Sequence, residues 1–217
     1  MLKIGIVGLA QAGKTTFFRI VTKAHGAGLA SGKPAEHVGV VSVPDSRLDT
    51  LSQMFNPRRT APASIEYVDT AGSIIDLARA GAQSAMLREV QALAHVIRAF
   101  DSDSEIRLLR DLESVEVELI LSDLAQVEKR VERLEKDVKK MKNPALDLEL
   151  QTLLVCKEAL ESQQPLRELN FTPEQQRAVR GFTFLSLKPV LYILNLSEKD
   201  AARTGRAEEF AAAAGLR

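Results

Sequence analysis

The sequence predicts an α/β domain, with a mostly parallel β-sheet and helices on both faces, into which an antiparallel coiled-coil helical hairpin is inserted. Three observations lead to this fold class. Short apolar segments alternate with glycine-containing turns in the first part of the chain, a heptad pattern occupies the middle, and the α/β pattern returns near the end. We therefore expect residues 1–103 and 164–217 to form the α/β domain and residues 104–163 to form the hairpin.

The composition is that of an ordinary globular protein, because 45% of the 217 residues are hydrophobic and 27% are charged. Lysine plus arginine and aspartate plus glutamate number 29 each, which argues against a protein that coats nucleic acid. The lone Cys156 excludes a disulfide scaffold and favours a reducing compartment. No segment approaches the roughly 18 consecutive apolar residues of a membrane span, so we expect a cytoplasmic protein without a membrane partner.

The first half of the chain supplies four predicted strands, each a short and nearly continuous apolar run, as is typical of strands covered on both faces. These strands are Leu2–Val7, Val38–Val43, Ala63–Val68 and Ala92–Phe100. Helical patterns are predicted at Lys14–Lys23 and Met86–Gln91.

The hairpin is predicted from apolar residues that recur at alternating steps of four and three, which is a coiled-coil seam. The seam consists of Ile120, Leu124, Val127, Val131, Leu134, Val138 and Met141. Asn143-Pro144 interrupts it, and a similar spacing then resumes at Leu146, Leu150, Leu153 and Leu160. Two long helices joined by such a short turn are expected to pack antiparallel.

The last part of the chain returns to the α/β pattern. Thr172-Pro173 offers an N-cap followed by proline at the first helical position, which predicts a helix to about Phe184. A fifth strand is predicted at Val190–Leu194, and a final helix is predicted over Glu198–Ala214.

A phosphate-binding loop follows the first predicted strand and opens the first predicted helix. Residues 8–15 fit the pattern G-x-x-x-x-G-K-[ST] at every fixed position. The candidate nucleotide-binding residues are Gly8, Leu9, Ala10, Gln11, Ala12, Gly13, Lys14, Thr15 and Thr16. We expect Lys14, facing solvent from an open loop, to neutralise the outer phosphates and the Thr15 hydroxyl to bind Mg²⁺.

Two further segments complete the candidate site. Asp69 and Gly72 form a D-x-x-G motif after the third strand. There the carboxylate can bind Mg²⁺ and the glycine N–H can sense the terminal phosphate. The alternative is that this segment is a simple turn that ends the strand. Asn195 and Glu198 follow the fifth strand, where a base would lie. GTPases usually have N-K-x-D there, so the longer glutamate leaves the choice of base open; alternatively, the two residues only end a strand and begin a helix.

With these motifs the chain resembles the Obg-like ATPase family, the YchF subfamily of the translation-factor-related P-loop GTPases. The resemblance extends over nearly the whole chain and also rests on residues 38–48, 118–124, 128–130 and 188–192. It implies a P-loop NTPase with a Ras-like G domain and an inserted coiled-coil hairpin, with Mg as cofactor. It also implies a preference for ATP, matched by the N-x-x-E form at Asn195 and Glu198, and association with ribosomes.

The chain departs from this family in several places. Ser73 stands where Ras-like enzymes have a glutamine and this family has a hydrophobic residue, and Lys33 stands where a threonine is expected to sense Mg²⁺. We therefore expect nucleotide binding to be better preserved than hydrolysis, and no catalytic residue is assigned. The chain also stops before a last strand and a C-terminal TGS domain, which favours a fragment of a longer protein.

The functional hypothesis is a P-loop NTPase that binds ATP or GTP with Mg and acts as a slow ribosome-associated switch. One alternative is a nucleotide-binding module with little or no hydrolysis, and another is a coiled-coil adaptor with a vestigial nucleotide site. Lys139, Lys140 and Lys142 near the hairpin tip could contact ribosomal RNA. Their basic run is interleaved with acidic residues, so a solvated helix surface is the alternative.

Overall fold

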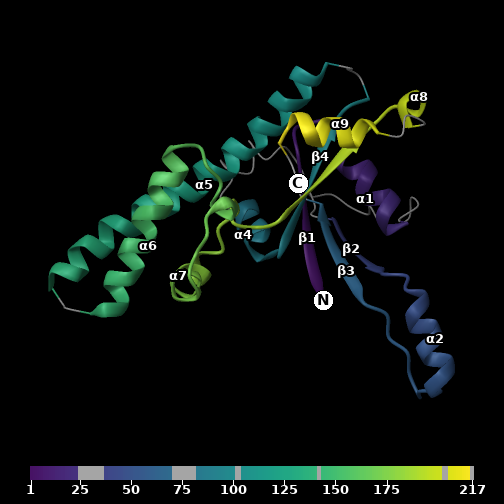
Figure 1. The fold of residues 1–217 in the computed structure, drawn as a ribbon, viewed down its shortest axis with the longest axis horizontal. Helices are drawn as coiled ribbons and strands as arrows, with labels where there is room; N and C mark the ends of the chain where they lie inside the picture. Colours follow the sequence, from purple (N-terminus) through teal and green to yellow (C-terminus); the bar gives the residue numbers. More distant parts are fainter. Residues whose placement is uncertain (24–36, 70–81, 101–103, 141–142, 202–204, 216–217) are drawn as a thin grey trace.

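A computed structural model describes residues 1–23, 37–69, 82–100, 104–140, 143–201 and 205–215. Its centre is a five-stranded sheet with the order β2-β3-β1-β4-β5 (Figure 1). The strands are β1 (Leu2–Val7), β2 (His37–Ser42), β3 (Ser64–Asp69), β4 (Ala92–Arg98) and β5 (Val190–Asn195). Only the β2–β3 pair is antiparallel, so the mostly parallel α/β sheet predicted from the sequence is confirmed.

Helices cover both faces of the sheet. Ile4 and Ile6 of β1 belong to a buried cluster with Phe18 of α1 (Lys14–Thr22). Val7, on the alternate face, joins a second cluster with residues of α4 (Ala82–Glu89) and of the first half of α5 (Glu105–Lys140). The nearly continuous apolar sequence of β1 is therefore explained by burial of both of its faces.

The hairpin consists of α5 and α6 (Pro144–Glu161), which lie side by side and extend away from the sheet (Figure 1). The residues buried along their contact are Ile120, Val127, Val131, Leu134, Leu153, Cys156, Ala159 and Leu160. Asn143, where the seam is interrupted, caps α6 by accepting a hydrogen bond from the Ala145 N–H. Arg130 of α5 makes a two-pronged ion pair with Glu149 of α6, at 2.7 and 3.0 Å.

One helix was not predicted from the sequence. Asp45 caps α2 (Ser46–Phe55), which projects from the far end of the β2–β3 pair (Figure 1) and buries none of its residues. Its large apolar side chains include Met54 and Phe55, which are 70% and 73% exposed. Its apolar residues Leu48, Leu51, Met54 and Phe55 do recur at a helical spacing, so this helix could have been predicted from the sequence.

The structure corrects two predictions near the C-terminus. The helix that begins at Pro173 was expected to reach Phe184, but α7 ends at Val179 and a 3-10 turn, Arg180–Phe182, follows it. The prediction of one helix over Glu198–Ala214 is also wrong. The structure has α8 (Glu198–Ala201) and α9 (Arg206–Ala213), and Gly205 adopts a left-handed backbone (φ 107°) immediately before α9.

Among the residues that the structure describes, no helix is both long enough and apolar enough to cross a membrane.

Candidate nucleotide-binding site

The phosphate-binding loop connects the carboxyl end of β1 to the amino end of α1, which begins at Lys14. Gly8 and Gly13 both have positive φ angles, of 149° and 95°. A Cβ atom at Gly8 would lie 2.5 Å from the Val96 carbonyl oxygen of β4, and one at Gly13 would lie 2.1 Å from the Asn195 side chain. Both glycines of the motif are therefore required by the close approach of neighbouring strands as well as by the backbone conformation.

The Lys14 side chain is turned into the loop. Lys14 is 9% exposed, and its Nζ donates hydrogen bonds to the Gly8 carbonyl at 3.2 Å and to the Leu9 carbonyl at 2.8 Å. The expectation of a solvent-facing lysine is therefore wrong. The ammonium group nevertheless lies within the curve of the loop, where phosphates would bind against the amino end of α1. Ala10, Gln11 and Thr16 are exposed around it, whereas Ala12 is buried.

Thr15 and Asp69 meet at the base of the loop. The Thr15 hydroxyl donates a hydrogen bond of 2.9 Å to Asp69 Oδ2, although the two residues are 54 positions apart in the sequence. Asp69 is 2% exposed, and its other oxygen, Oδ1, has no hydrogen-bond partner among the described residues. An unpartnered carboxylate oxygen beside a threonine hydroxyl is a donor set that fits Mg²⁺, which commonly uses one or two protein oxygens together with the phosphates of its substrate.

The environment of Asp69 raises the pKa of its carboxyl group above the ordinary value. Burial is the largest cause, and it is opposed by the Thr15 hydrogen bond and by the positive charges of His37, Lys14 and Arg19. Ionising the buried Asp69 carboxyl group therefore costs free energy, and a bound divalent cation would reduce that cost.

The third predicted segment also reaches the loop. Asn195, the last residue of β5, donates from Nδ2 to the Ala12 carbonyl at 3.0 Å. Glu198 is exposed at the first position of α8. The sequence indicated a base contact for Asn195 but not this hydrogen bond, because nothing in the residue order shows that the ends of β1 and β5 lie close together.

Comparison with known proteins places these features in a family. The chain is 37% identical over 213 residues to the "Ribosome-binding ATPase YchF" of Bacillus subtilis, which covers 93% of this chain and 58% of the relative. It is 36% identical over 217 residues to "Obg-like ATPase 1" of Oryza sativa subsp. indica, covering 93% and 54%. The chain is therefore homologous to Obg-like ATPases over 90–93% of its own length. No protein-family model matches the chain.

One solved structure shows the same similarity. A structure titled as the Schizosaccharomyces pombe YchF GTPase superposes with a TM-score of 0.75 at 28% identity, covering 99% of this chain and 64% of that one. The chain thus spans little more than half the length of the curated Obg-like relatives.

Several residues singled out in the sequence lie outside the part of the chain that the structure describes. They are Lys33, Gly72, Ser73, Met141 and Lys142.

Replacing Asp69 by asparagine is expected to have opposite effects on stability and on metal binding. Since the folded state raises the pKa of Asp69, stability falls as pH rises from the ordinary carboxyl range through that raised pKa. Asparagine removes the buried charge and can still accept the Thr15 hydrogen bond. We expect D69N to raise the melting temperature at neutral pH by about 2–4 °C and to abolish any strengthening of ATP binding by Mg²⁺.

The measurement is a thermal melt between pH 4 and pH 8, together with ATP titration with and without Mg²⁺. D49N, on the exposed face of α2, is the matched control and should change neither quantity. A lower melting temperature for D69N, or a retained Mg²⁺ effect, would contradict the assignment of Asp69.

Proposed function

We propose that this chain is the nucleotide-binding part of a P-loop NTPase that binds ATP or GTP with Mg²⁺ and acts as a slow, ribosome-associated switch. The observation that carries the proposal is the contact between Thr15 and Asp69 at the base of the phosphate-binding loop. It joins two motifs from different strands, and a P-loop NTPase needs both at one metal.

The phosphate-binding loop and the residues that contact it have different parts in this function. The N–H groups at the amino end of α1 would receive the phosphates, and the Lys14 ammonium, already inside the loop, would exchange its carbonyl partners for phosphate oxygens. Thr15 and Asp69 would hold Mg²⁺, which when bound neutralises charge on the outer phosphates. Asn195 would keep β5 and the base-binding end of the site against the loop.

The nucleotide is tested by equilibrium titration of the 217-residue chain with labelled ATP and GTP, with and without Mg²⁺. With glutamate at position 198, ATP should bind at least as well as GTP, and discrimination should stay within about tenfold, or ~1.4 kcal/mol. A hundredfold preference for GTP would contradict this expectation. Single-turnover hydrolysis separates a slow NTPase from a module that only binds nucleotide, and undetectable nucleotide binding would support the coiled-coil adaptor.

Ribosome association rests on the relatives, among them the "Ribosome-binding ATPase YchF" of Bacillus subtilis. In this chain the exposed Lys139 and Lys140 end α5 at the far end of the hairpin, and Lys142 follows them in the sequence. Arg130, in contrast, is held by Glu149 and serves the hairpin itself. We infer that the tip lysines contact ribosomal RNA phosphates.

Replacing Lys139, Lys140 and Lys142 by glutamate should weaken co-sedimentation with ribosomes, with the largest difference at low salt. The matched control replaces Lys129, Arg133 and Lys136 by glutamate. These residues lie on α5 and are exposed, as Lys139 and Lys140 are, and their replacement changes the net charge by the same amount. Equal co-sedimentation of the two variants across a salt series would assign the tip to ordinary solvated surface.

A further inference from the structure

A groove of about 810 Å³ lies at the opposite edge of the sheet from the phosphate-binding loop. Its wall includes Gln91, directly before β4, and Lys188 and Pro189, directly before β5. The loop, in contrast, follows the carboxyl end of β1, and β1, β4 and β5 run parallel. The groove is therefore separate from the nucleotide-binding site.

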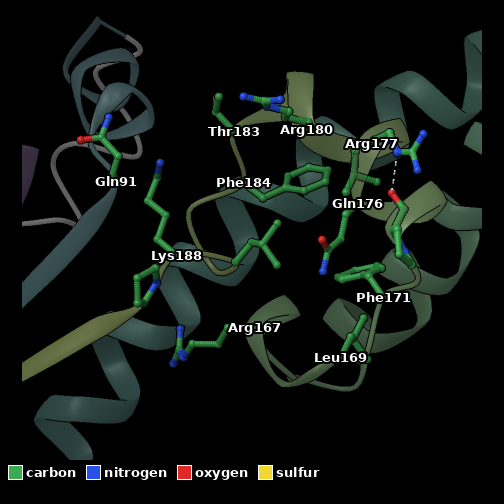
Figure 2. A pocket seen from close by; sticks show the side chains of 14 residues that line it. Gln91, Arg167, Leu169, Phe171, Gln176, Arg177, Arg180, Thr183, Phe184 and Lys188 are labelled. Atoms are coloured by element: carbon green, nitrogen blue, oxygen red, sulfur yellow. Dashed lines mark hydrogen bonds between the residues drawn. The ribbon is translucent and has the colours of Figure 1, made fainter. Parts of the chain in front are cut away.

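The floor of the groove is apolar. Leu169, Phe171 and Leu187 line the groove and are half-buried, and the lining residue Phe184 is 1% exposed. Figure 2 shows Leu169, Phe171 and Phe184 at the groove. A volume of this size is large enough for several side chains of a ligand. Half-covered apolar side chains in a groove gain stability when a second apolar surface removes them from water.

Four cations surround this floor, and none of the described residues lining the groove carries a carboxylate. The cations are Arg167, Arg177, Arg180 and Lys188 (Figure 2). The excess of positive charge among the lining residues favours an anionic ligand.

Two of the four cations are held by hydrogen bonds to other residues of the chain. Arg167 donates to Glu116 at 2.5 Å, and Lys188 donates to the Arg88 and Val90 carbonyls at the end of α4, at 3.0 and 2.5 Å.

The other two cations are exposed and are held more weakly. Arg177 donates from Nε to the Pro173 carbonyl at 3.3 Å and makes a 3.4 Å pair with Glu174 on the exposed surface of α7, where such pairs are weak. Arg180, in the turn after α7, has no ion-pair or hydrogen-bond partner for its side chain among the described residues. The α7 wall therefore presents two guanidinium groups that can bind carboxylates in a two-pronged manner.

An extended acidic peptide fits this arrangement better than RNA does. In an extended chain alternate side chains point to opposite sides, so apolar residues can enter the groove while carboxylates reach the rim. Single-stranded RNA is usually held by several exposed rings on which its bases stack, together with a track of cations. Here Phe171 is the one lining ring with part of its surface open, and the floor is otherwise aliphatic or buried.

We propose that this groove is a docking site for a partner protein, which inserts an extended segment of alternating acidic and large apolar residues. The apolar side chains cover Leu169, Phe171 and Leu187, and the carboxylates pair with Arg177 and Arg180.

The test begins with a library of random linear peptides displayed on phage and selected on the 217-residue chain. Selected peptides, synthesised with a fluorescein label, are titrated by fluorescence anisotropy. We expect sequences in which Asp or Glu alternate with Leu, Ile or Phe. Their affinity should fall by about tenfold or more in the double variant R177E/R180E. The control R58E/R59E, which makes the same charge change at exposed arginines after α2, should bind like the wild type.

Three further measurements make the result decisive. Replacing the apolar residues of a selected peptide by serine should abolish binding, and a fluorescein-labelled oligouridylate should neither bind the groove nor displace the peptide. K14A, in the nucleotide site, should leave peptide affinity unchanged. The proposal is overturned if no selected peptide discriminates R177E/R180E from R58E/R59E. It is equally overturned if the oligouridylate displaces the peptide and loses affinity in R177E/R180E.

Discussion

K14A is expected to remove nucleotide triphosphate binding while leaving the chain folded. Lys14 supplies the one ammonium group seen within the curve of the described phosphate-binding loop, and its Nζ donates hydrogen bonds to the Gly8 and Leu9 carbonyls of that loop. Losing a charge-assisted hydrogen bond to phosphate costs about 1.5–3 kcal/mol, and more in a desolvated site. The affinity for nucleotide should therefore fall by about tenfold to a hundredfold, and by more if the site is desolvated.

The affinity is measured by titration with labelled ATP, and folding is followed by circular dichroism. K3A is the matched control, because Lys3 lies at the opposite end of β1 and makes only a surface ion pair with Glu66. Should K14A bind ATP as tightly as the wild type does, the phosphate site would be assigned to the wrong loop.

D123A is expected to produce the largest loss of stability. Asp123, in the middle of α5, is fully buried and accepts hydrogen bonds from the Ser186 N–H at 2.7 Å, the Ser186 hydroxyl at 2.8 Å and the Leu185 N–H at 3.0 Å. It also pairs with Arg88 of α4 at 3.2 Å. Alanine would leave the buried N–H groups and the guanidinium without this partner, a type of loss that costs about 3–5 kcal/mol.

For a chain of this length the corresponding decrease in melting temperature is about 6–20 °C. Thermal and urea melts of D123A are compared with those of E132A, which removes an exposed carboxylate from the same helix. D123N, which keeps one acceptor oxygen, should lie between the wild type and D123A. If D123A melts within a degree of E132A, Asp123 does not hold α5 against α4 and the segment before β5.

The two variants differ in what the sequence reveals about them. Lys14 belongs to a motif whose residues are contiguous, so its role follows from the order of glycines, lysine and threonine between a strand and a helix. Asp123 looks like an ordinary acidic residue within a charged helix. Its partners are Arg88 of α4 and two residues before β5, Leu185 and Ser186. No local sequence pattern indicates these contacts.

Secondary structure shows the same division. β1 was predicted at its observed bounds because an apolar run before a glycine-rich loop is a local feature. The break between α8 and α9 was missed, since the sequence from Glu198 onward has helix-forming residues on both sides of Gly205. Glycine is tolerated within many helices, and here only the left-handed conformation of Gly205 reveals that the chain turns.

The sequence by itself determined the α/β class, the heptad seam and the phosphate-binding loop, because each depends on the periodicity or spacing of residues within a short segment. Tertiary structure alone decided which distant residues meet. It brought the Asp69 carboxylate to the Thr15 hydroxyl, joined Asn195 to the loop, and placed Arg177 and Arg180 beside an apolar groove. Such contacts depend on the strand order of the sheet and on burial, and these are set by packing of the whole chain, not by any local pattern.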